Sequence, residues 1–369
     1  MISEEHFYAI ALRECNLIGD INFNKLIGVF GNAKSVWENA KKEYRKLDGF
    51  GHKTVSDIGN SVHLQFAEKE VKFCETNNID IKLKHLNELP YLLSECDDAP
   101  AILYQKGIFR DSLHPLSIVG TRNITAYGKE FIKDFFEETK SCNFISVSGL
   151  ALGVDKEVHD QSLHHKIPTV AVLAHGFHTL YPSKNKRLSD KILQDGGALF
   201  TEFNSSRKPD RENFIQRNRI IAGISPATVV VETAFGGGSV STATFANNYN
   251  RDVFALPGKI TDQYSQGCNH LIFQNKAATI STIKDLIINL GFNKPKEKIE
   301  ELFLRSSTTI QLTENQRIIY NSIIENPQIN LDDLAQKIVL PTHKILPVIL
   351  ELELLGKVKS FSGRQFIAI

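Results

Sequence analysis

Between Pro115 and Phe292 the chain alternates between short apolar runs and amphipathic stretches of helical length. Near-continuous Val, Ile and Leu residues indicate strands buried on both faces, and such strands form parallel sheets with helices on either side. The alternation therefore predicts an α/β fold, an extended Rossmann-like parallel sheet. The predicted strands are residues 116–120, 144–149, 169–176, 198–203, 227–232, 253–257 and 277–280.

A module of short helices is predicted at the start of the chain, over residues 1–62. This segment has apolar residues at helical spacing and turn signals at Gly19, at Gly31 and in the run Asp48-Gly49-Phe50-Gly51. The pattern is similar to a helix–hairpin–helix or sterile-alpha-motif (SAM) domain. Such a module either holds a DNA phosphate at a turn or serves as a protein-contact bundle, and the sequence alone leaves both open.

The predicted Rossmann-like domain spans residues 63–292, because a helix at 62–77 and short strands at 79–81 and 101–104 precede the alternation. A charged linker, residues 293–311, follows it.

The end of the chain, residues 312–369, predicts a winged helix. Pro347 lies within the third helix, where it interrupts the backbone hydrogen bonds unless it belongs to the first turn. That helix is dominated by Leu, Ile and Val and offers only His343 and Lys344 for base contacts, so we expect it to contact protein rather than to read DNA bases. The predicted elements are helices 313–325, 331–337 and 342–355 and a hairpin of 357–359 and 365–367 that turns at Ser362-Gly363.

The composition is that of a cytoplasmic protein. The first residues lack a basic start followed by an apolar stretch, and no apolar run approaches 18 residues, so we expect neither export nor a membrane. The net charge is +1, so any phosphate-binding surface must be local. The cysteines have no paired or metal-like spacing and are expected to be reduced thiols: Cys15, Cys74, Cys96, Cys142 and Cys268.

Glycines and polar residues follow the predicted strands directly. Gly120-Thr121-Arg122 ends the first strand just before a helix, where backbone N–H groups and a guanidinium can cradle a phosphate. Gly149 and Asp155 follow the second strand, and Gly236-Gly237-Gly238-Ser239 forms a second anion nest after the fifth. Ligands of open α/β sheets bind beyond the carboxyl ends of the strands, so these loops predict one shared site.

Arg217-Asn218-Arg219 places two guanidiniums around an Asn in an otherwise apolar stretch. Residues two apart on a helix point to different sides. We therefore expect one Arg to reach the site while the other pairs with a carboxylate such as Glu202 or Glu232. Asp155 is either a helix cap or a ligand contact, and His159, one turn later, is more readily explained as a structural histidine.

A set of motifs over about residues 85–290 resembles the DNA-processing protein A (DprA/Smf) family in order and spacing. The motifs are Val119-Gly120-Thr121-Arg122, Ser148-Gly149-Leu150-Ala151, Gly153-Val154-Asp155 with His159, Tyr181-Pro182 with Asn185, Arg217-Asn218-Arg219-Ile220-Ile221-Ala222-Gly223-Ile224-Ser225, and Pro257-Gly258 with Gly267-Cys268-Asn269.

The resemblance implies a single-stranded-DNA-binding recombination mediator that protects incoming DNA and loads RecA recombinase in natural transformation. It implies no enzymatic activity, cofactor or metal, and a homodimer formed through about residues 271–286. In the family the Gly-Ser/Thr-Arg turn belongs to the DNA pocket. The residues predicted to contact DNA are Gly120, Thr121, Arg122, Gly149, Lys184, Asn185, Arg217, Asn218, Arg219, Gly238 and Ser239.

An enzyme is the alternative. Nucleotide phosphoribohydrolases of the lysine-decarboxylase-like group share this sheet architecture, and Asp155, Glu202 and Glu232 could serve as acid/base groups. Their compact Pro-Gly-Gly-x-Gly-Thr run is absent here. A dinucleotide-dependent oxidoreductase is disfavoured because no G-x-G-x-x-G follows the first strand.

Overall fold

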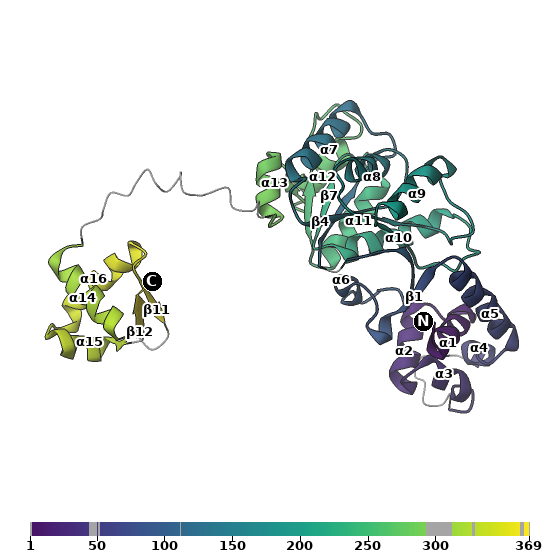
Figure 1. Cartoon of the computed structure of the whole chain (residues 1–369), viewed down its shortest axis with the longest axis horizontal. Helices are drawn as coiled ribbons and strands as arrows, with labels where there is room; N and C mark the ends of the chain where they lie inside the picture. Colours follow the sequence, from purple (N-terminus) through teal and green to yellow (C-terminus); the bar gives the residue numbers. More distant parts are fainter. Residues whose placement is uncertain are drawn as a thin grey trace. The chain divides into compact units, whose positions relative to one another are not determined.

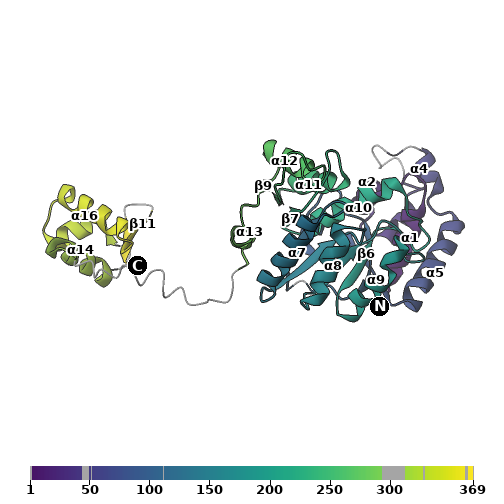
Figure 2. The same cartoon turned by 90° about the horizontal axis from the view of Figure 1, so that it is seen from above.

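The computed structural model describes residues 2–43, 50, 52–110, 112–292, 312–326, 329–361 and 365–368. The chain divides into two compact units, Met1–Pro295 and Lys296–Ile369 (Figures 1 and 2). The predicted linker, most of the turn at residues 48–51 and the hairpin turn at Ser362-Gly363 lie outside the described residues. Among the helices in the described ranges, none is long and apolar enough to cross a bilayer.

A nine-stranded sheet forms the centre of the first unit, in the order β1-β2-β6-β5-β4-β3-β7-β8-β9. Seven neighbouring strands run parallel to one another: β6, β5, β4, β3, β7, β8 and β9. At one edge of the sheet, β2 pairs antiparallel with β6 and β1 pairs antiparallel with β2. This confirms the predicted α/β fold with a mostly parallel sheet. The strands are β1 (Ile79–Leu83), β2 (Ile102–Gly107), β3 (His114–Val119), β4 (Phe144–Ser148), β5 (Thr169–Val172), β6 (Ala198–Thr201), β7 (Ala227–Val230), β8 (Asp252–Ala255) and β9 (Ala278–Thr279).

Several predicted strands are longer than the observed ones, and the difference is largest for the third. Residues 169–176 were expected to be extended, but β5 ends at Val172. His175 and Gly176 instead pack against the loop that follows β6, where the Gly176 N–H donates to the Arg207 carbonyl at 2.8 Å. The apolar run therefore continues past the end of the strand into a buried loop.

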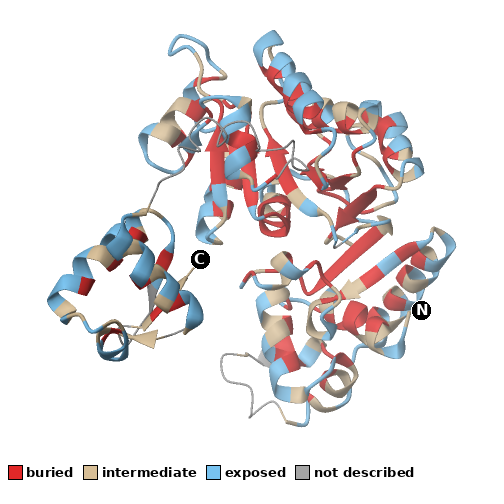
Figure 3. Cartoon of the chain, turned by 60° about the vertical axis from the view of Figure 1, so that its left-hand side comes forward, coloured by how far each residue is buried: buried red, intermediate tan, exposed pale blue. Residues whose placement is uncertain are grey.

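Helices cover both faces of this sheet, because successive strand residues point to opposite sides. Val119 and Val147 face the core shared with α6 (Tyr91–Ser94), α10 (Arg211–Ile224), α11 (Gly238–Asn248) and α12 (Gln266–Phe273). Ile118 and Ala171 face α7 (Ala126–Thr139), α8 (Val154–His164), α9 (Lys186–Gln194) and α13 (Ile283–Asn289). Figure 3 shows the strands buried between helices whose outer faces are exposed.

The strand order reverses at β3. Its neighbours are β4 on one side and β7 on the other, with Ser117 level with Val147 and Thr228. The loops after β3 and β7 therefore leave the sheet in different directions and open a crevice beyond the carboxyl ends, which is where ligands of open α/β sheets bind.

The helices at the start of the chain share their core with the edge of the sheet. They are α1 (Glu4–Glu14), α2 (Asp20–Phe30), α3 (Ala33–Asn39), α4 (His52–Asp57) and α5 (Ser61–Thr76). Asn32 caps α3 and Asn60 caps α5 through their side-chain oxygens. Ile10 on α1 belongs to the same apolar cluster as Ala67 on α5 and Ile81 on β1. The apolar core of these helices is therefore continuous with the edge of the sheet across residue 62, the predicted end of the helical module.

The described part of the second unit has three helices and a small sheet. They are α14 (Glu314–Glu325), β10 (Ile329–Asn330), α15 (Leu331–Ile338), α16 (Thr342–Leu354), β11 (Val358–Phe361) and β12 (Gln365–Ala368), with the strands in the order β10-β12-β11. Thr313 and Gln316 form a capping box at α14. Pro347 does not interrupt α16, contrary to the expectation, because Ile345, Ile349 and Leu352 hold the helix against the core while Pro347 faces solvent.

Candidate nucleic-acid interface

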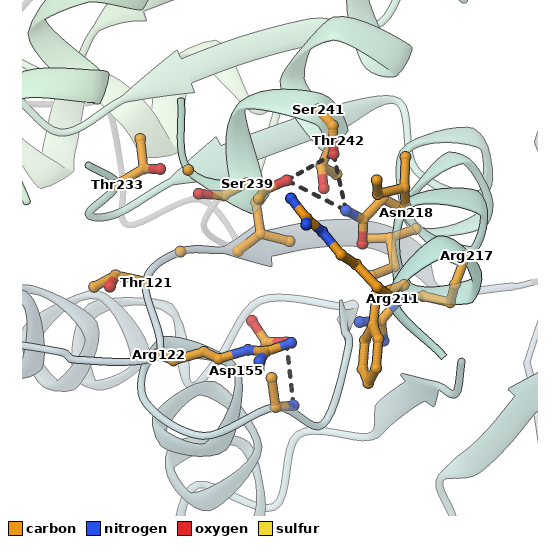
Figure 4. Close-up of a pocket in the computed structure, with 18 of the residues that line it drawn as sticks. Thr121, Arg122, Asp155, Arg211, Arg217, Asn218, Thr233, Ser239, Ser241 and Thr242 are labelled. Atoms are coloured by element: carbon orange, nitrogen blue, oxygen red, sulfur yellow. Dashed lines mark hydrogen bonds between the residues drawn. The ribbon is translucent and has the colours of Figure 1, made fainter. Parts of the chain in front are cut away.

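A cavity of about 870 Å³ lies beyond the carboxyl ends of β3 and β7. Figure 4 shows its two walls: Thr121 and Arg122 lie on one side, and Ser239, Ser241 and Thr242 lie on the other. Helix α10 contributes Arg211, Phe214 and Asn218. The cavity therefore lies at the place that the strand order predicts.

The first wall is the loop of Gly120, Thr121 and Arg122. The Thr121 N–H donates to the Glu232 carbonyl at 2.6 Å, and the Thr121 carbonyl accepts from Val154 N–H at 3.0 Å. These bonds fix the loop between the end of β7 and the start of α8. The Arg122 side chain remains exposed, with its Cζ 5.1 Å from the centre of the Phe214 ring, a cation–π contact. An exposed guanidinium on a fixed loop is suited to an anion.

A second cation lies beneath this wall. Arg217 is only 4% exposed, and its Nη1 donates to the carbonyls of Gly149, at 2.6 Å, and Val172. Burial, opposed by the charge of Asp155 and assisted by that of Arg122, lowers the pKa of Arg217 to about 10. The side chain stays charged at neutral pH. A Cβ at Gly149 would lie 2.3 Å from Nη1, so any larger residue at this position would displace the Arg217 guanidinium.

The second wall is the start of α11. The helix begins after Gly237, which offers no side chain to cap it, so its first N–H groups are available to an anion. Asn218 holds this turn from α10, because its Nδ2 donates to Gly238 O at 3.2 Å and to Ser241 Oγ at 2.9 Å. The buried Ser239 hydroxyl has no hydrogen-bond partner among the described residues. The nest of glycines predicted here thus faces the cavity.

The lining residues that sequence analysis missed include Arg211 and Phe214. They follow Asp210, whose side chain caps α10 by accepting from Glu212 N–H. Arg211, Phe214 and Asn218 are spaced by three and four residues, so they share one face of α10. The sequence did hold a signal for them: counting back from the predicted Asn218 by four residues and then by three reaches Phe214 and Arg211.

Four residues predicted to contact DNA do not line the cavity: Gly149, Lys184, Asn185 and Arg219. Gly149 is buried against the Arg217 guanidinium. Lys184 lies exposed on the short turn η3 (Ser183–Asn185). Asn185 is buried, and its Nδ2 donates to Leu150 O at 2.9 Å, which fixes the loop after β4.

Arg219 points away from the cavity, toward the helices at the start of the chain. It pairs with Glu202 and, at 3.1 Å, with Asp20 on α2, and it also donates to the Asp98 carbonyl. The prediction that one arginine of the pair is engaged by Glu202 is confirmed. A buried guanidinium with these partners holds the fold together and is not available to a ligand.

The carboxylates of the alternative, enzymatic interpretation have structural partners. Glu232 accepts from Thr125 N at 2.9 Å and from its hydroxyl at 2.5 Å, which fixes the start of α7. Glu202 accepts from Arg219 and from Gln216 Nε2 at 2.9 Å. Asp155 lines the cavity but is buried, and burial raises its pKa. Its carboxylate accepts from Ala151 N–H at 3.3 Å.

His159 is a structural histidine. It is fully buried, and its Nδ1 lies 2.7 Å from the Thr169 hydroxyl. Burial, assisted by the charge of Arg217, lowers the pKa of His159 to about 3. The imidazole is therefore neutral at any physiological pH.

In the part of the chain that the structure describes, one group of side chains is close enough to hold a metal. The donor atoms of Cys15, Asp57 and His63 lie within 4.8 Å of one another, which the sequence spacing had not suggested. The Asp57 carboxylate already accepts from Asn16 N–H at 2.8 Å and lies 3.1 Å from His63 Nε2. Burial raises the pKa of Cys15 to about 12, so the thiol stays protonated. These contacts join α1, α4 and α5.

Known proteins are similar to this chain in sequence and in fold. The sequence model of DNA recombination-mediator protein A matches residues 81–291, which contain every element around the cavity. The chain belongs to this family. The Smf protein of Synechocystis is 32% identical over 79% of this chain and 74% of its own. The DNA processing protein DprA of Bacillus subtilis is 37% identical over 58% of this chain and 71% of its own.

Two solved structures of DprA proteins resemble this fold. That of Streptococcus pneumoniae superposes with a TM-score of 0.61 and 26% identity, over 79% of this chain and 99% of that one. The Helicobacter pylori protein, whose structure was described for its single-stranded DNA binding mode, superposes with a TM-score of 0.52 and 26% identity, over 57% of this chain and 95% of that one.

Proposed function

We propose that this chain binds single-stranded DNA in the cavity between β3 and β7 and delivers it to RecA recombinase. The observation that carries the proposal is the pairing of the exposed Arg122 with the uncapped start of α11 across one cavity. Both groups attract phosphate, and the buried charge of Arg217 strengthens the local positive potential. The protein of H. pylori, a relative in fold, binds single-stranded DNA.

The aromatic side chains favour a single strand over a duplex. Tyr181 is 47% exposed and meets Phe214 edge to face, with 5.7 Å between ring centroids. Both rings line the cavity beside Arg122. Unpaired bases stack on such rings with little sequence preference, whereas paired bases are already stacked within the duplex. We therefore expect weak sequence preference and weaker binding of duplex DNA.

The proposed activity is binding and not catalysis. Glu202 and Glu232 are engaged in ion pairs or helix capping, and Asp155 is held below the surface beside Arg217. None of the three is placed like a general acid or base that can approach a substrate and exchange protons with it.

We further propose that the chain forms a homodimer through residues 271–286 and acts in the cytoplasm. β9 is the edge strand of the sheet, and both of its residues are exposed. Leu271 and Leu286 are buried within their own chain, but the neighbouring Phe273 is 82% exposed. The second unit has the order of elements of a winged helix, and we propose that it contacts protein and not bases.

The test is a fluorescence-anisotropy titration of labelled oligo-dT, with a duplex of equal length as the comparison. About four engaged phosphates would give a slope of log K against log salt near −3. Equal affinity for duplex, or an affinity that salt does not change, would contradict the proposal. Delivery to RecA is tested separately, by the rate of RecA assembly on oligo-dT coated with single-strand-binding protein, which the chain is expected to raise.

A further inference from the structure

A second cavity, of about 260 Å³, lies where the helices at the start of the chain meet the sheet. Arg13 on α1, Phe66 on α5 and Tyr104 on β2 line it, together with Glu202, which directly follows β6. Drug-sized ligands fill cavities of roughly 300–1,000 Å³, so this one suits a single flat ring system or a similarly small group. We call it the second cavity, and the cavity between β3 and β7 the first cavity.

One carboxylate oxygen of Glu202 lacks a hydrogen-bond partner. The side chain is only 3% exposed. Its Oε2 accepts from Gln216 Nε2 at 2.9 Å and from Arg219, whereas Oε1 is buried and has no partner in the part of the chain that the structure describes. Burial, against the opposing charge of Arg219, raises the pKa of Glu202 to about 7. Because buried oxygens are normally hydrogen-bonded, this carboxylate is suited to a ligand that brings an N–H donor into the second cavity.

The two cavities share the loop that follows β6 and the helix that follows this loop. Arg207 lines the second cavity, while Pro209 and Asp210 of the same loop line the first. On α10, Gln216 lines the second cavity and Phe214 lines the first. Arg207 is exposed, so its guanidinium is accessible to a phosphate at the mouth of the second cavity. A strand held in the first cavity therefore has a route of one loop to the second.

An unpaired carboxylate oxygen discriminates among the four bases. Guanine presents two adjacent N–H donors, at N1 and N2, on its Watson–Crick edge. The one N–H of thymine lies between two carbonyl oxygens, which a carboxylate repels. Adenine and cytosine have an amino group, but a ring nitrogen that accepts hydrogen bonds lies beside it. Phe66 and Phe203, both half-buried, add aromatic surface to the second cavity, as in other sites that hold an unstacked base. The lining thus fits guanine best.

We propose that the second cavity binds one guanine base of a single strand whose backbone lies in the first cavity, with Glu202 Oε1 accepting from the guanine N–H groups. This inference rests on the proposed function and adds to it. The first cavity holds a strand with little sequence preference, and the second adds a preference at one position. Base contacts of this kind discriminate by at least about fivefold.

Anisotropy competition with the full-length chain tests the preference. Three strands of equal length are compared: oligo-dT, and oligo-dT with one central residue replaced by dG or by dA. The dG strand should bind at least fivefold more tightly than oligo-dT, and the dA strand within about twofold of it, since adenine stacks as a purine but has no N–H at N1. Equal gains from dG and dA would assign the preference to stacking and overturn the proposal. No gain from dG, with oligo-dT still bound, would overturn it and leave the proposed function standing; failure to bind any of the strands would refute both.

Two variants separate the second cavity from the fold around Arg219. Glu202→Gln should lower the affinity for the dG strand to that for oligo-dT. Asp20→Asn is the matched control, because Asp20 also pairs with Arg219, at 3.1 Å, but does not line the second cavity. This variant should keep the preference for dG. Loss of the preference in both variants would show that it depends on the packing of Arg219, and the proposal would fail.

Photochemical cross-linking of the native chain gives a readout that needs no variant. A strand with 6-thioguanine at the central position is irradiated in the complex, and the modified peptides are identified by mass spectrometry. The base should attach to the peptides that contain Phe66 or Phe203, whereas 4-thiothymine at the same position should attach to those that contain Tyr181 or Phe214. Attachment of 6-thioguanine only to the peptides of Tyr181 and Phe214, which line the first cavity, would overturn the proposal.

Discussion

Replacement of Arg122 by alanine is expected to remove a large part of the affinity for single-stranded DNA. The side chain is exposed on a loop that backbone bonds to Glu232 and Val154 hold in place, and it makes no ion pair with any residue in the described ranges. A charge-assisted contact with phosphate contributes about 1.5–3 kcal/mol. The dissociation constant should therefore rise about 10- to 150-fold.

Anisotropy titration with oligo-dT at several salt concentrations measures this effect. The slope of log K against log salt should fall in magnitude by about 0.7, the value for one phosphate contact on a single strand. Arg122→Lys should recover only part of the affinity, because an ammonium group cannot bind phosphate with two parallel hydrogen bonds. Arg187→Ala is the matched control, since Arg187 is exposed on α9 and does not line the cavity.

The melting temperature decides how such a result is interpreted. Arg122→Ala should leave it nearly unchanged, because an exposed loop residue rarely contributes much to stability. If the variant unfolds while its remaining folded fraction binds oligo-dT normally, Arg122 is a structural residue and the reasoning is refuted. The DNA site would then have to be sought first around Arg211 and the start of α11.

Three further predictions concern the surrounding structure. Arg217→Met should destabilise the chain by about 3–5 kcal/mol and lower the melting temperature by about 10 °C, because it leaves the carbonyls of Gly149 and Val172 buried without their donor and removes the positive charge beside the buried Asp155. Below pH 6.5, His159 should lower the free energy of unfolding by about 1.4 kcal/mol per pH unit, because the unfolded chain binds a proton there that the folded chain does not bind above about pH 3. In urea titrations, the free energy of unfolding of a His159→Gln variant should therefore fall between pH 7 and pH 5 by about 2 kcal/mol less than that of the native chain. Deletion of residues 306–369 should change the affinity for oligo-dT by no more than a few-fold, and a loss beyond about 30-fold would show that the second unit holds DNA.

The strands and the position of the cavity could be predicted because both depend on local patterns. Apolar runs are read directly from the sequence, and the carboxyl ends of parallel strands meet at one edge of the sheet. Gly120 and Gly238 were found in this way. The sequence predicts less about the direction in which each side chain points. Arg217 and Arg219 differ by two positions on α10, and only the packing of α2 and β4 determines which one is turned to the cavity.

The same limit explains why Asn185 and Lys184 do not line the cavity. A polar residue after a strand can face either the ligand or the neighbouring loop, and the sequence pattern is the same in both cases. The Asn185 amide finds the Leu150 carbonyl, a partner 35 residues away in the chain. Conversely, Phe214 lies in an ordinary apolar stretch, and its exposure to the cavity follows from where α10 begins.

The contacts of Arg219 have a consequence for dividing this protein into parts. A chain shortened to begin at residue 63 would lose Asp20 and the α1 side chains that share an apolar cluster with β1 and β2. Glu202 and Arg219 would be left beside a newly wetted surface, and α10 would lose one of its anchors. Since α10 also carries Phe214 and Asn218, the early helices support one wall of the cavity, and their removal should weaken that wall from a distance.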